Sequence, residues 1–297
     1  MDWEAFRDSH GTRDEFIERD YLRAGTPVPS NILPLDDMLC GGFRPGLHVL
    51  GGEPGAGKSA LGLFVSMMCA LSGARVEYVS LEMSRAQCIE RCLSCVSKME
   101  GDPFKWGDVW RLARDARDGV EAEGPGYLDT DPVCVAYSSL ERKCPGLVVA
   151  DSIALHEVGG IERELSEGRG NGLDMAVVDY FQYVSVDGAA GEYERVSEAS
   201  KRLNVLAVSL GIPIVAIASC SRAGARAAGT PDMHSFKGSG DIEYHALTAM
   251  VIDRDPDGSD TERRLHVVKN RFGGVTGDGG WIPLMFDGEH NSFELAR

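Results

Sequence analysis

GGEPGAGKSA, residues 51–60, satisfies the pattern G-x-x-x-x-G-K-[S/T] in full. The four defining positions are Gly52, Gly57, Lys58 and Ser59. In such a loop the glycines let backbone N–H groups converge on phosphates, the lysine reaches the β- and γ-phosphates, and the hydroxyl binds Mg²⁺. An apolar segment typical of a buried strand, GLHVLGG (46–52), precedes the loop, and an apolar helical segment, 58–72, follows it. This context predicts a P-loop with ATP and Mg²⁺ as cofactors, and disfavours a glycine-rich turn with a surface lysine.

Contacts with the nucleotide are expected along the whole loop. The residues expected to bind it are Gly52, Glu53, Pro54, Gly55, Ala56, Gly57, Lys58, Ser59 and Ala60. Asp179 closes the apolar segment MAVVDY (175–180), and an acid there can hold Mg²⁺ or its water. The alternative for Asp179 is a residue that caps a turn, which the upstream P-loop disfavours. Ser59 and Asp179 are therefore the expected metal ligands.

Apolar segments typical of strands alternate with helical segments along the chain. Further strands are predicted at 74–81, 175–180, 212–219, 247–254, 264–270 and 281–286, with a possible short strand at VCVAY (133–137). Further helices are predicted at 3–23, 84–99 and 193–210. Uniformly apolar strands separated by helices are typical of a parallel sheet covered on both faces. We therefore predict an α/β fold, with a mostly parallel twisted sheet and helices on both faces.

The composition is that of a soluble globular protein: 297 residues, 43% hydrophobic and 26% charged. No apolar run is long enough to span a bilayer, and the acidic start of the chain is unlike a secretory signal. A cytoplasmic location with no membrane partner is expected. The net charge is −16. Because proteins neutralise nucleic-acid phosphates with Lys and Arg, a nucleic-acid partner requires a local basic strip on this acidic body.

Three of the eight cysteines, Cys88, Cys92 and Cys95, have a spacing that iron–sulfur proteins also use. They fall within the helix predicted at 84–99, where Ser84 and Gln87 fit a capping box. The i, i+4, i+7 positions place the thiols on one apolar stripe. Buried, reduced thiols are expected rather than a metal site.

Glu82 ends the second predicted strand, in VSLEMS. A carboxylate at this edge of a parallel sheet can orient and deprotonate an attacking water. A glutamate that only complements the dipole of the following helix is the alternative. Spacing alone leaves both readings open.

Four motifs resemble, in their order, the hexameric replicative helicases of the DnaB type. They are SLEMS (80–84) followed by Gln87 and Arg91, VVDYFQ (177–182), SGDIE (239–243) and KNRFGG (269–274). The resemblance runs from about Asn31 to the C-terminus, and four ordered motifs are far more specific than a P-loop. It implies a RecA-like core, six copies of which form a ring around single-stranded DNA.

The resemblance also implies roles for single residues. Glu82 becomes the catalytic base, Asp179 the Mg²⁺ acid, and Arg91 a contact to the nucleotide base. Lys269 and Arg271 match a basic pair that reaches the neighbouring subunit's nucleotide site, where an arginine finger stabilises charge on the transferred phosphoryl group. A solvated strand end is the alternative for this pair. The catalytic residues so implied are Lys58, Glu82, Lys269 and Arg271.

A DNA-binding loop is implied by the segment FKGSG (236–240). The residues that match it are Lys237, Gly238, Ser239 and Gly240. Backbone amides and a basic side chain there would follow DNA phosphates. Arg222 and Arg226 lie in the same glycine-rich loop. For these two, a merely solvated loop remains open.

Three features depart from the family pattern. No counterpart of the family's helical N-terminal domain precedes the core, so primase or loader recruitment through that domain is not expected. Ser219 stands where the family usually has a glutamine that senses the γ-phosphate, and a serine is too short to do this without water. Gly238 stands where an acid is common.

The organisation expected is therefore a linker-like helix and hinge over 1–30, followed by a RecA-like ATPase domain over 31–297. The leading hypothesis is a ring-forming, hexameric, ATP-dependent helicase that moves on single-stranded DNA. The alternative is an ATP-binding oligomer similar to RadA or KaiC, with a regulatory or scaffold role and no unwinding. The net charge and Ser219 favour this alternative. A small-molecule kinase is disfavoured, because nothing resembles an acceptor lid.

Overall fold

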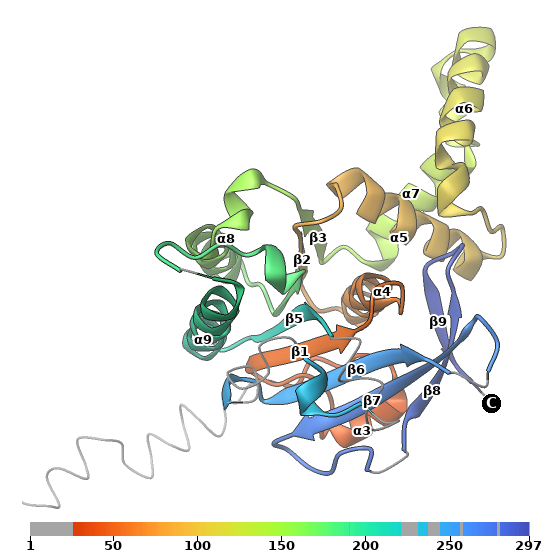
Figure 1. The fold of residues 1–297 in the computed structure, drawn as a ribbon. Helices are drawn as coiled ribbons and strands as arrows, with labels where there is room; N and C mark the ends of the chain where they lie inside the picture. The colour runs from red at the N-terminus through yellow and green to blue at the C-terminus, as the bar shows by residue number, and fades with distance from the viewer. Residues whose placement is uncertain are drawn as a thin grey trace, which may run out of the picture.

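The computed structural model describes residues 26–189, 191–220, 231–236, 244–255, 258–277 and 280–296. The helix predicted at 3–23 and the proposed DNA-loop residues Arg222, Arg226 and Lys237 to Gly240 lie outside these ranges. The described chain forms a nine-stranded sheet with helices on both faces (Figure 1). The predicted α/β fold is confirmed.

The strand order is β3-β2-β4-β5-β1-β6-β7-β8-β9. The strands are β1 (Gly46–Gly52), β2 (Val76–Ser80), β3 (Leu147–Ala150), β4 (Met175–Asp179), β5 (Pro213–Ser219), β6 (Thr248–Arg254), β7 (Glu262–Asn270), β8 (Ile282–Asp287) and β9 (Ser292–Leu295). The first six strands in this order, from β3 to β6, pair in parallel with their neighbours. β7, β8 and β9 extend the sheet beyond β6 as antiparallel strands.

Helices cover the sheet in two layers. The longer helices are α4 (Lys58–Leu71), α5 (Arg85–Glu100), α6 (Val109–Glu123), α7 (Pro132–Lys143), α8 (Val158–Gly170) and α9 (Glu192–Leu210), and α3 (Leu33–Met38) is short. The short 3₁₀ turns are η2 (Trp106–Asp108), η3 (Pro125–Asp129), η4 (Ile153–His156), η5 (Phe181–Tyr183) and η6 (Met233–Ser235). One apolar core lies under α3, α4, α5 and α7, and a second lies under α8 and α9 (Figure 1).

The central strand, β1, fixes the place of the functional site. All seven of its residues are buried, because β5 and β6 flank it and helices cover both faces. Gly52 pairs with Ser219 of β5, and Ser80 of β2 pairs with Asp179 of β4. The carboxyl ends of these parallel strands therefore meet at one edge of the sheet, where ligands of open α/β sheets bind.

The possible strand at VCVAY (133–137) is wrong, because these residues form the first turns of α7. The Asp131 carboxylate accepts hydrogen bonds from the backbone N–H groups of Val133 and Cys134, and Pro132 occupies the first helical position. These are strong helix-start signals, and they outweigh the strand preference of a short apolar run. β3 and β9 were not predicted.

The cysteine-bearing segment is the predicted helix, α5. Ser84 and Gln87 form the capping box at its start. Cys88, Cys92 and Cys95 are each 0% exposed, and burial raises the pKa of Cys88 to about 11. Across the described ranges, no group of His, Cys, Asp and Glu side chains is arranged to hold a metal ion.

The α6 helix projects from the body as an arm (Figure 1). Val109 is its only buried residue, and Trp110 is 68% exposed. Within the part of the chain that the structure describes, none of the helices combines the length and apolar character that crossing a bilayer requires.

A buried glutamate next to an exposed one makes the stability of this fold depend on pH. Glu77 of β2 is 4% exposed, and burial, followed by the charge and hydrogen bond of Glu164 on α8, raises its pKa to about 7. In an unfolded chain a glutamate ionises near about 4.3. The folded state therefore keeps this proton where the unfolded state loses it. The resulting stabilisation is complete below the unfolded pKa and is lost as pH rises through about 7.

We expect Glu77→Gln to be more stable than the wild type at pH 8 by at most about 4 kcal/mol, with little difference at pH 4. Glutamine has the shape of the protonated acid but does not ionise. Urea unfolding between pH 4 and 8 measures the difference. Glu167→Gln, an exposed change on the same helix as Glu164, is the control. A parallel pH dependence for Glu77→Gln and the wild type would contradict the prediction.

Candidate active site

A cavity of about 360 Å³ opens where the strand ends meet. Eight residues predicted to form the site line it: Pro54, Gly55, Gly57, Lys58, Ser59, Ala60, Glu82 and Arg91. Three others, Tyr180, Ser219 and Phe286, complete its wall. The structure therefore brings the P-loop and the predicted base together.

The P-loop backbone has the shape that phosphate binding requires. Gly57 has φ of 103°, a left-handed conformation that costs a glycine little, and α4 begins directly after it. A Cβ on Gly52 would lie 2.5 Å from the carbonyl oxygen of Ile252, so only glycine fits beside β6. The start of α4 thus faces the cavity with free N–H groups, which bind anions.

Lys58 and Glu82 are placed to act on a phosphate group. The Lys58 ammonium donates to the carbonyl oxygen of Glu53 at 3.1 Å. Burial lowers the pKa of Lys58, while Cys220, Asp179 and Glu82 oppose this shift. A phosphate in the cavity would supply the anionic partner that a half-buried ammonium favours. Glu82 is exposed at the cavity wall, where its carboxylate can reach water.

The predicted metal ligands are in direct contact. The Ser59 hydroxyl donates to Oδ1 of Asp179 at 3.1 Å, although the two residues are 120 positions apart. Burial raises the pKa of Asp179, whereas hydrogen bonds from Tyr78 and Ser59 lower it. A hydroxyl and a carboxylate are oxygen ligands of the kind that Mg²⁺ prefers, so this donor set fits the ion.

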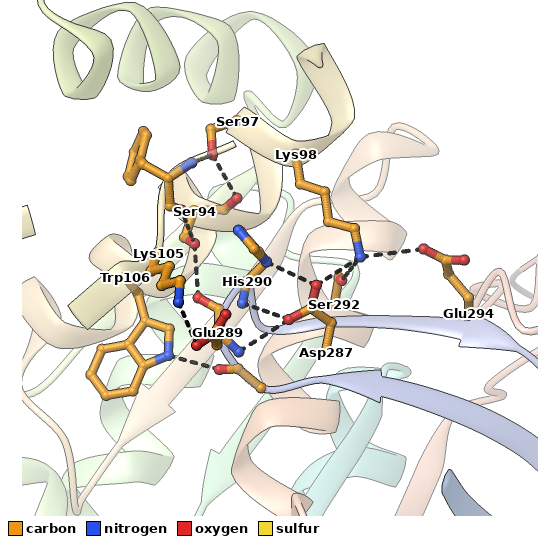
Figure 2. A network of polar contacts seen from close by, with 12 residues as sticks. Ser94, Ser97, Lys98, Lys105, Trp106, Asp287, Glu289, His290, Ser292 and Glu294 are labelled. Atoms are coloured by element: carbon orange, nitrogen blue, oxygen red, sulfur yellow. Dashed lines mark hydrogen bonds and ion pairs between the residues drawn. The ribbon is translucent and has the colours of Figure 1, made fainter. Parts of the chain in front are cut away.

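Arg91 reaches the cavity from α5, where it lies over an aromatic ring. Its guanidinium carbon is 4.2 Å from the centre of the Trp106 ring. The Trp106 indole N–H donates to the carbonyl oxygen of Gly288 at 2.8 Å, in the turn between β8 and β9 (Figure 2). The Nε atom of Arg91 is buried and has no hydrogen-bond partner among the described residues. Arg91 is thus held by stacking, and its cation remains available to a ligand.

A polar network joins the same elements. Lys98 of α5 donates to Asp287 at 2.9 Å and to Ser292 at 3.0 Å, and Lys105 donates to Glu289 at 2.7 Å (Figure 2). These bonds fasten α5 and the segment after it to the β8–β9 turn. Each of the two attached elements also contributes a residue to the cavity wall, Arg91 from α5 and Phe286 from β8.

Lys269 and Arg271 lie away from this cavity. β7 runs antiparallel to β6, so that Asn270 pairs with Thr248, which in turn pairs with His48 near the start of β1. Gly52 and the P-loop are at the other end of β1. The Arg271 guanidinium donates to the carbonyl oxygen of Tyr244 at 2.8 Å. A single copy of the chain therefore does not bring the predicted finger pair to its own P-loop.

The family profile described as the DnaB-like helicase C terminal domain matches residues 27–295. The chain belongs to this family. The DnaB-like domain is 28% identical over 281 residues to the replicative DNA helicase DnaB of Geobacillus stearothermophilus, covering 90% of this chain and 56% of that protein. It is 27% identical over 292 residues to the replicative DNA helicase DnaC of Bacillus subtilis, covering 93% of this chain and 59% of that protein. The chain thus spans somewhat more than half the length of these relatives.

Solved structures confirm the fold. One solved ATPase domain superposes with a TM-score of 0.73 at 20% identity, covering 99% of this chain and 98% of that one. A DnaB-like replicative helicase studied with primase also gives a TM-score of 0.73, at 21% identity, covering 95% of this chain and 66% of that one. The predicted RecA-like architecture and the recognition of the family are both confirmed.

The sequence did not predict that three further residues, Arg254, Arg263 and Phe286, lie around the P-loop. Arg263 of β7 is 5% exposed, donates to the carbonyl oxygen of Ala56 at 3.0 Å, and stacks 5.2 Å from the Phe286 ring. Arg254 of β6 donates to the carbonyl oxygen of Gly55 at 3.3 Å. Arg254 and Arg263 are paired across β6 and β7, a register that the sequence did not reveal. The DnaB-like domain therefore surrounds its P-loop with cations and an aromatic ring.

Ser219, one of the departures from the family pattern, is in hydrogen-bond contact with a glutamine from another element. The Ser219 N–H donates to Oε1 of Gln182 at 3.2 Å. Gln182 is 8% exposed, and its Nε2 has no hydrogen-bond partner in the part of the chain that is described. An amide group therefore lies next to the cavity wall at Ser219, although it comes from η5 and not from β5.

Trp106→Leu is expected to weaken binding of a nucleotide by roughly tenfold, because Arg91 loses a stacking partner in a partly desolvated site. The affinity for a fluorescent ATP analogue measures this. Trp110→Leu removes an exposed tryptophan from the neighbouring helix α6 and serves as the control. Equal affinities for the two variants would show that stacking does not position Arg91.

Proposed function

We propose that this domain hydrolyses ATP with Mg²⁺ at interfaces between subunits of a hexameric ring, and uses the energy to move along single-stranded DNA as a helicase. The replicative helicases similar to this chain support the proposal, although this chain covers only part of their length. The observation that carries it is the separation of the P-loop cavity from Lys269 and Arg271, at opposite ends of the sheet.

The roles follow from the geometry of the cavity. The P-loop amides and Lys58 bind the phosphates, and Ser59 and Asp179 hold Mg²⁺, which would neutralise charge on the β- and γ-phosphates. Glu82 orients and deprotonates the attacking water. Arg91 and Phe286 contact the nucleotide from the α5 side and the β8 side. Arg271 of a neighbouring copy supplies a further cation at the γ-phosphate.

DNA-stimulated ATP hydrolysis tests the proposal. Single-stranded DNA is expected to raise the ATPase rate at low salt, and the effect should weaken steeply as salt increases, because few phosphate contacts must offset the repulsion of a chain with net charge −16. Lys237→Ala is expected to abolish the stimulation and to leave the basal ATPase rate intact. Blunt double-stranded DNA is the control ligand.

The alternative function is that of an ATP-binding oligomer with a regulatory or scaffold role. The net charge of −16 and the serine at position 219 favour it. It predicts nucleotide-dependent assembly with no stimulation by DNA. An ATPase rate that is unchanged by single-stranded DNA at low salt, in a protein that assembles with ATP, would make this function the better one.

A further inference from the structure

A tyrosine lies buried directly behind the predicted Mg²⁺ acid. Tyr78 is on β2, is 0% exposed, and pairs with Val177 of β4, two residues before Asp179. Its hydroxyl donates to Oδ2 of Asp179 at 2.5 Å and lies 3.4 Å from the carbonyl oxygen of Ser59. A phenylalanine would fill the same apolar space, so the hydroxyl needs an explanation of its own.

The Asp179 carboxylate has a different donor on each oxygen. The Ser59 hydroxyl bonds Oδ1 at 3.1 Å, and the Tyr78 hydroxyl bonds Oδ2 at 2.5 Å. Rotation of the carboxylate would break both hydrogen bonds. Oδ1 is therefore kept beside the Ser59 hydroxyl, and these two oxygens form the donor set that fits Mg²⁺. Buried hydrogen bonds to ionised groups are strong enough to fix an orientation of this kind.

We propose that Tyr78 is a positioning residue for the Mg²⁺ site, which holds the Asp179 carboxylate in the orientation that binds the ion. The inference rests on the proposed function, because it presupposes binding of a Mg²⁺–nucleotide complex. Tyr78 is not among the residues that line the cavity, so it acts through Asp179 and touches neither the nucleotide nor the reacting atoms.

Tyr78→Phe removes the hydroxyl and keeps the ring. The affinity for a fluorescent ATP analogue is measured with Mg²⁺ and again with EDTA, and the ratio of the two affinities reports the contribution of the ion. Tyr78→Phe is expected to lower this ratio by about tenfold, the size of one hydrogen bond to a charged group, with no change in EDTA. Tyr127→Phe, which removes a tyrosine hydroxyl next to the α6 arm, is expected to keep the wild-type ratio.

Two further variants separate positioning from a purely structural role. In an Asp179→Asn background, Tyr78→Phe is expected to cause no additional loss of the ratio. Tyr78 acts only by orienting the Asp179 carboxylate, and that carboxylate is already absent in this background. Tyr78→4-aminophenylalanine keeps a donor at the same place and is expected to restore most of the ratio. If Tyr78→Phe does not fold, Tyr78→Met is used, since methionine adapts to irregular core space and also lacks a donor.

The outcomes are distinct. A wild-type protein whose nucleotide affinity is the same in Mg²⁺ and EDTA would overturn the proposed Mg²⁺ chemistry itself. A wild-type ratio above one that Tyr78→Phe leaves unchanged would overturn the role of Tyr78 and leave the proposed function standing. A loss of thermal stability in Tyr78→Phe with an unchanged ratio would show that the hydroxyl serves only the core.

Discussion

Arg271→Ala is expected to lose at least about 10³-fold in the rate of ATP hydrolysis, while it binds ATP as the wild type does. A finger acts on charge that develops in the transition state, so its loss leaves ground-state binding intact. Arg271 follows β7 at the end of the sheet away from its own P-loop, and its guanidinium bonds the carbonyl oxygen of Tyr244 there. Arg117→Ala, an exposed arginine on α6, is the control and is expected to hydrolyse ATP normally.

Mixing two inactive proteins tests whether the finger acts between subunits. Glu82→Gln lacks its own base but carries an intact finger, and Arg271→Ala has the opposite defect. Mixed rings contain interfaces in which the intact cavity of one copy meets the intact finger of another, as heterologous, ring-closing assembly requires. Partial recovery of ATPase activity is expected after subunit exchange. If subunit exchange is confirmed and no mixing ratio restores activity, either the finger acts in cis or hydrolysis requires several adjacent intact sites. A monomer that hydrolyses ATP at the full rate would contradict a finger in trans.

Glu82→Gln is expected to bind ATP normally and to hydrolyse it roughly 10²–10⁴-fold more slowly, the usual contribution of a general base. The amide keeps the shape of the carboxylate and removes its ability to take a proton. Rapid-quench measurement of phosphate release gives the rate, and a nucleotide titration gives the affinity. Hydrolysis at the wild-type rate would exclude Glu82 as the base.

Lys58→Ala provides the contrast to Glu82→Gln. It removes the ammonium that faces the cavity, so nucleotide binding itself is expected to be lost. The pair of variants therefore separates binding from chemistry within one cavity. A Glu82→Gln protein that also fails to bind would indicate a structural role for Glu82 instead.

Much of the nucleotide site could be predicted from the sequence, because its parts are local. The P-loop motif, the strand before it and the helix after it occupy one continuous stretch, 46–72. Asp179 and Glu82 were readable for a similar reason, since each lies at the end of an apolar strand. Parallel strands end at a common edge, so these separate predictions come together without knowledge of the register.

The parts that were missed depend on pairing between distant strands. Arg254 and Arg263 meet at the P-loop because they pair directly across β6 and β7, in a register that no local pattern records. The contact between Tyr78 and Asp179 likewise needs the alignment of β2 with β4. The error at 133–137 was of another kind, since Asp131 and Pro132 already carried the helix signal.

β7 links the two ends of the molecule. Arg263, near its start, bonds the P-loop carbonyl of Ala56, and Arg271 directly follows its last residue. Eight residues of extended chain separate them by roughly 27 Å. A hydrogen-bonded strand bends far less than a loop, so a displacement at one end of β7 is carried to its other end. If Arg271 serves the nucleotide site of a neighbouring copy, as proposed, a displacement of the P-loop at one end of β7 would move the cation that the other end presents to that copy.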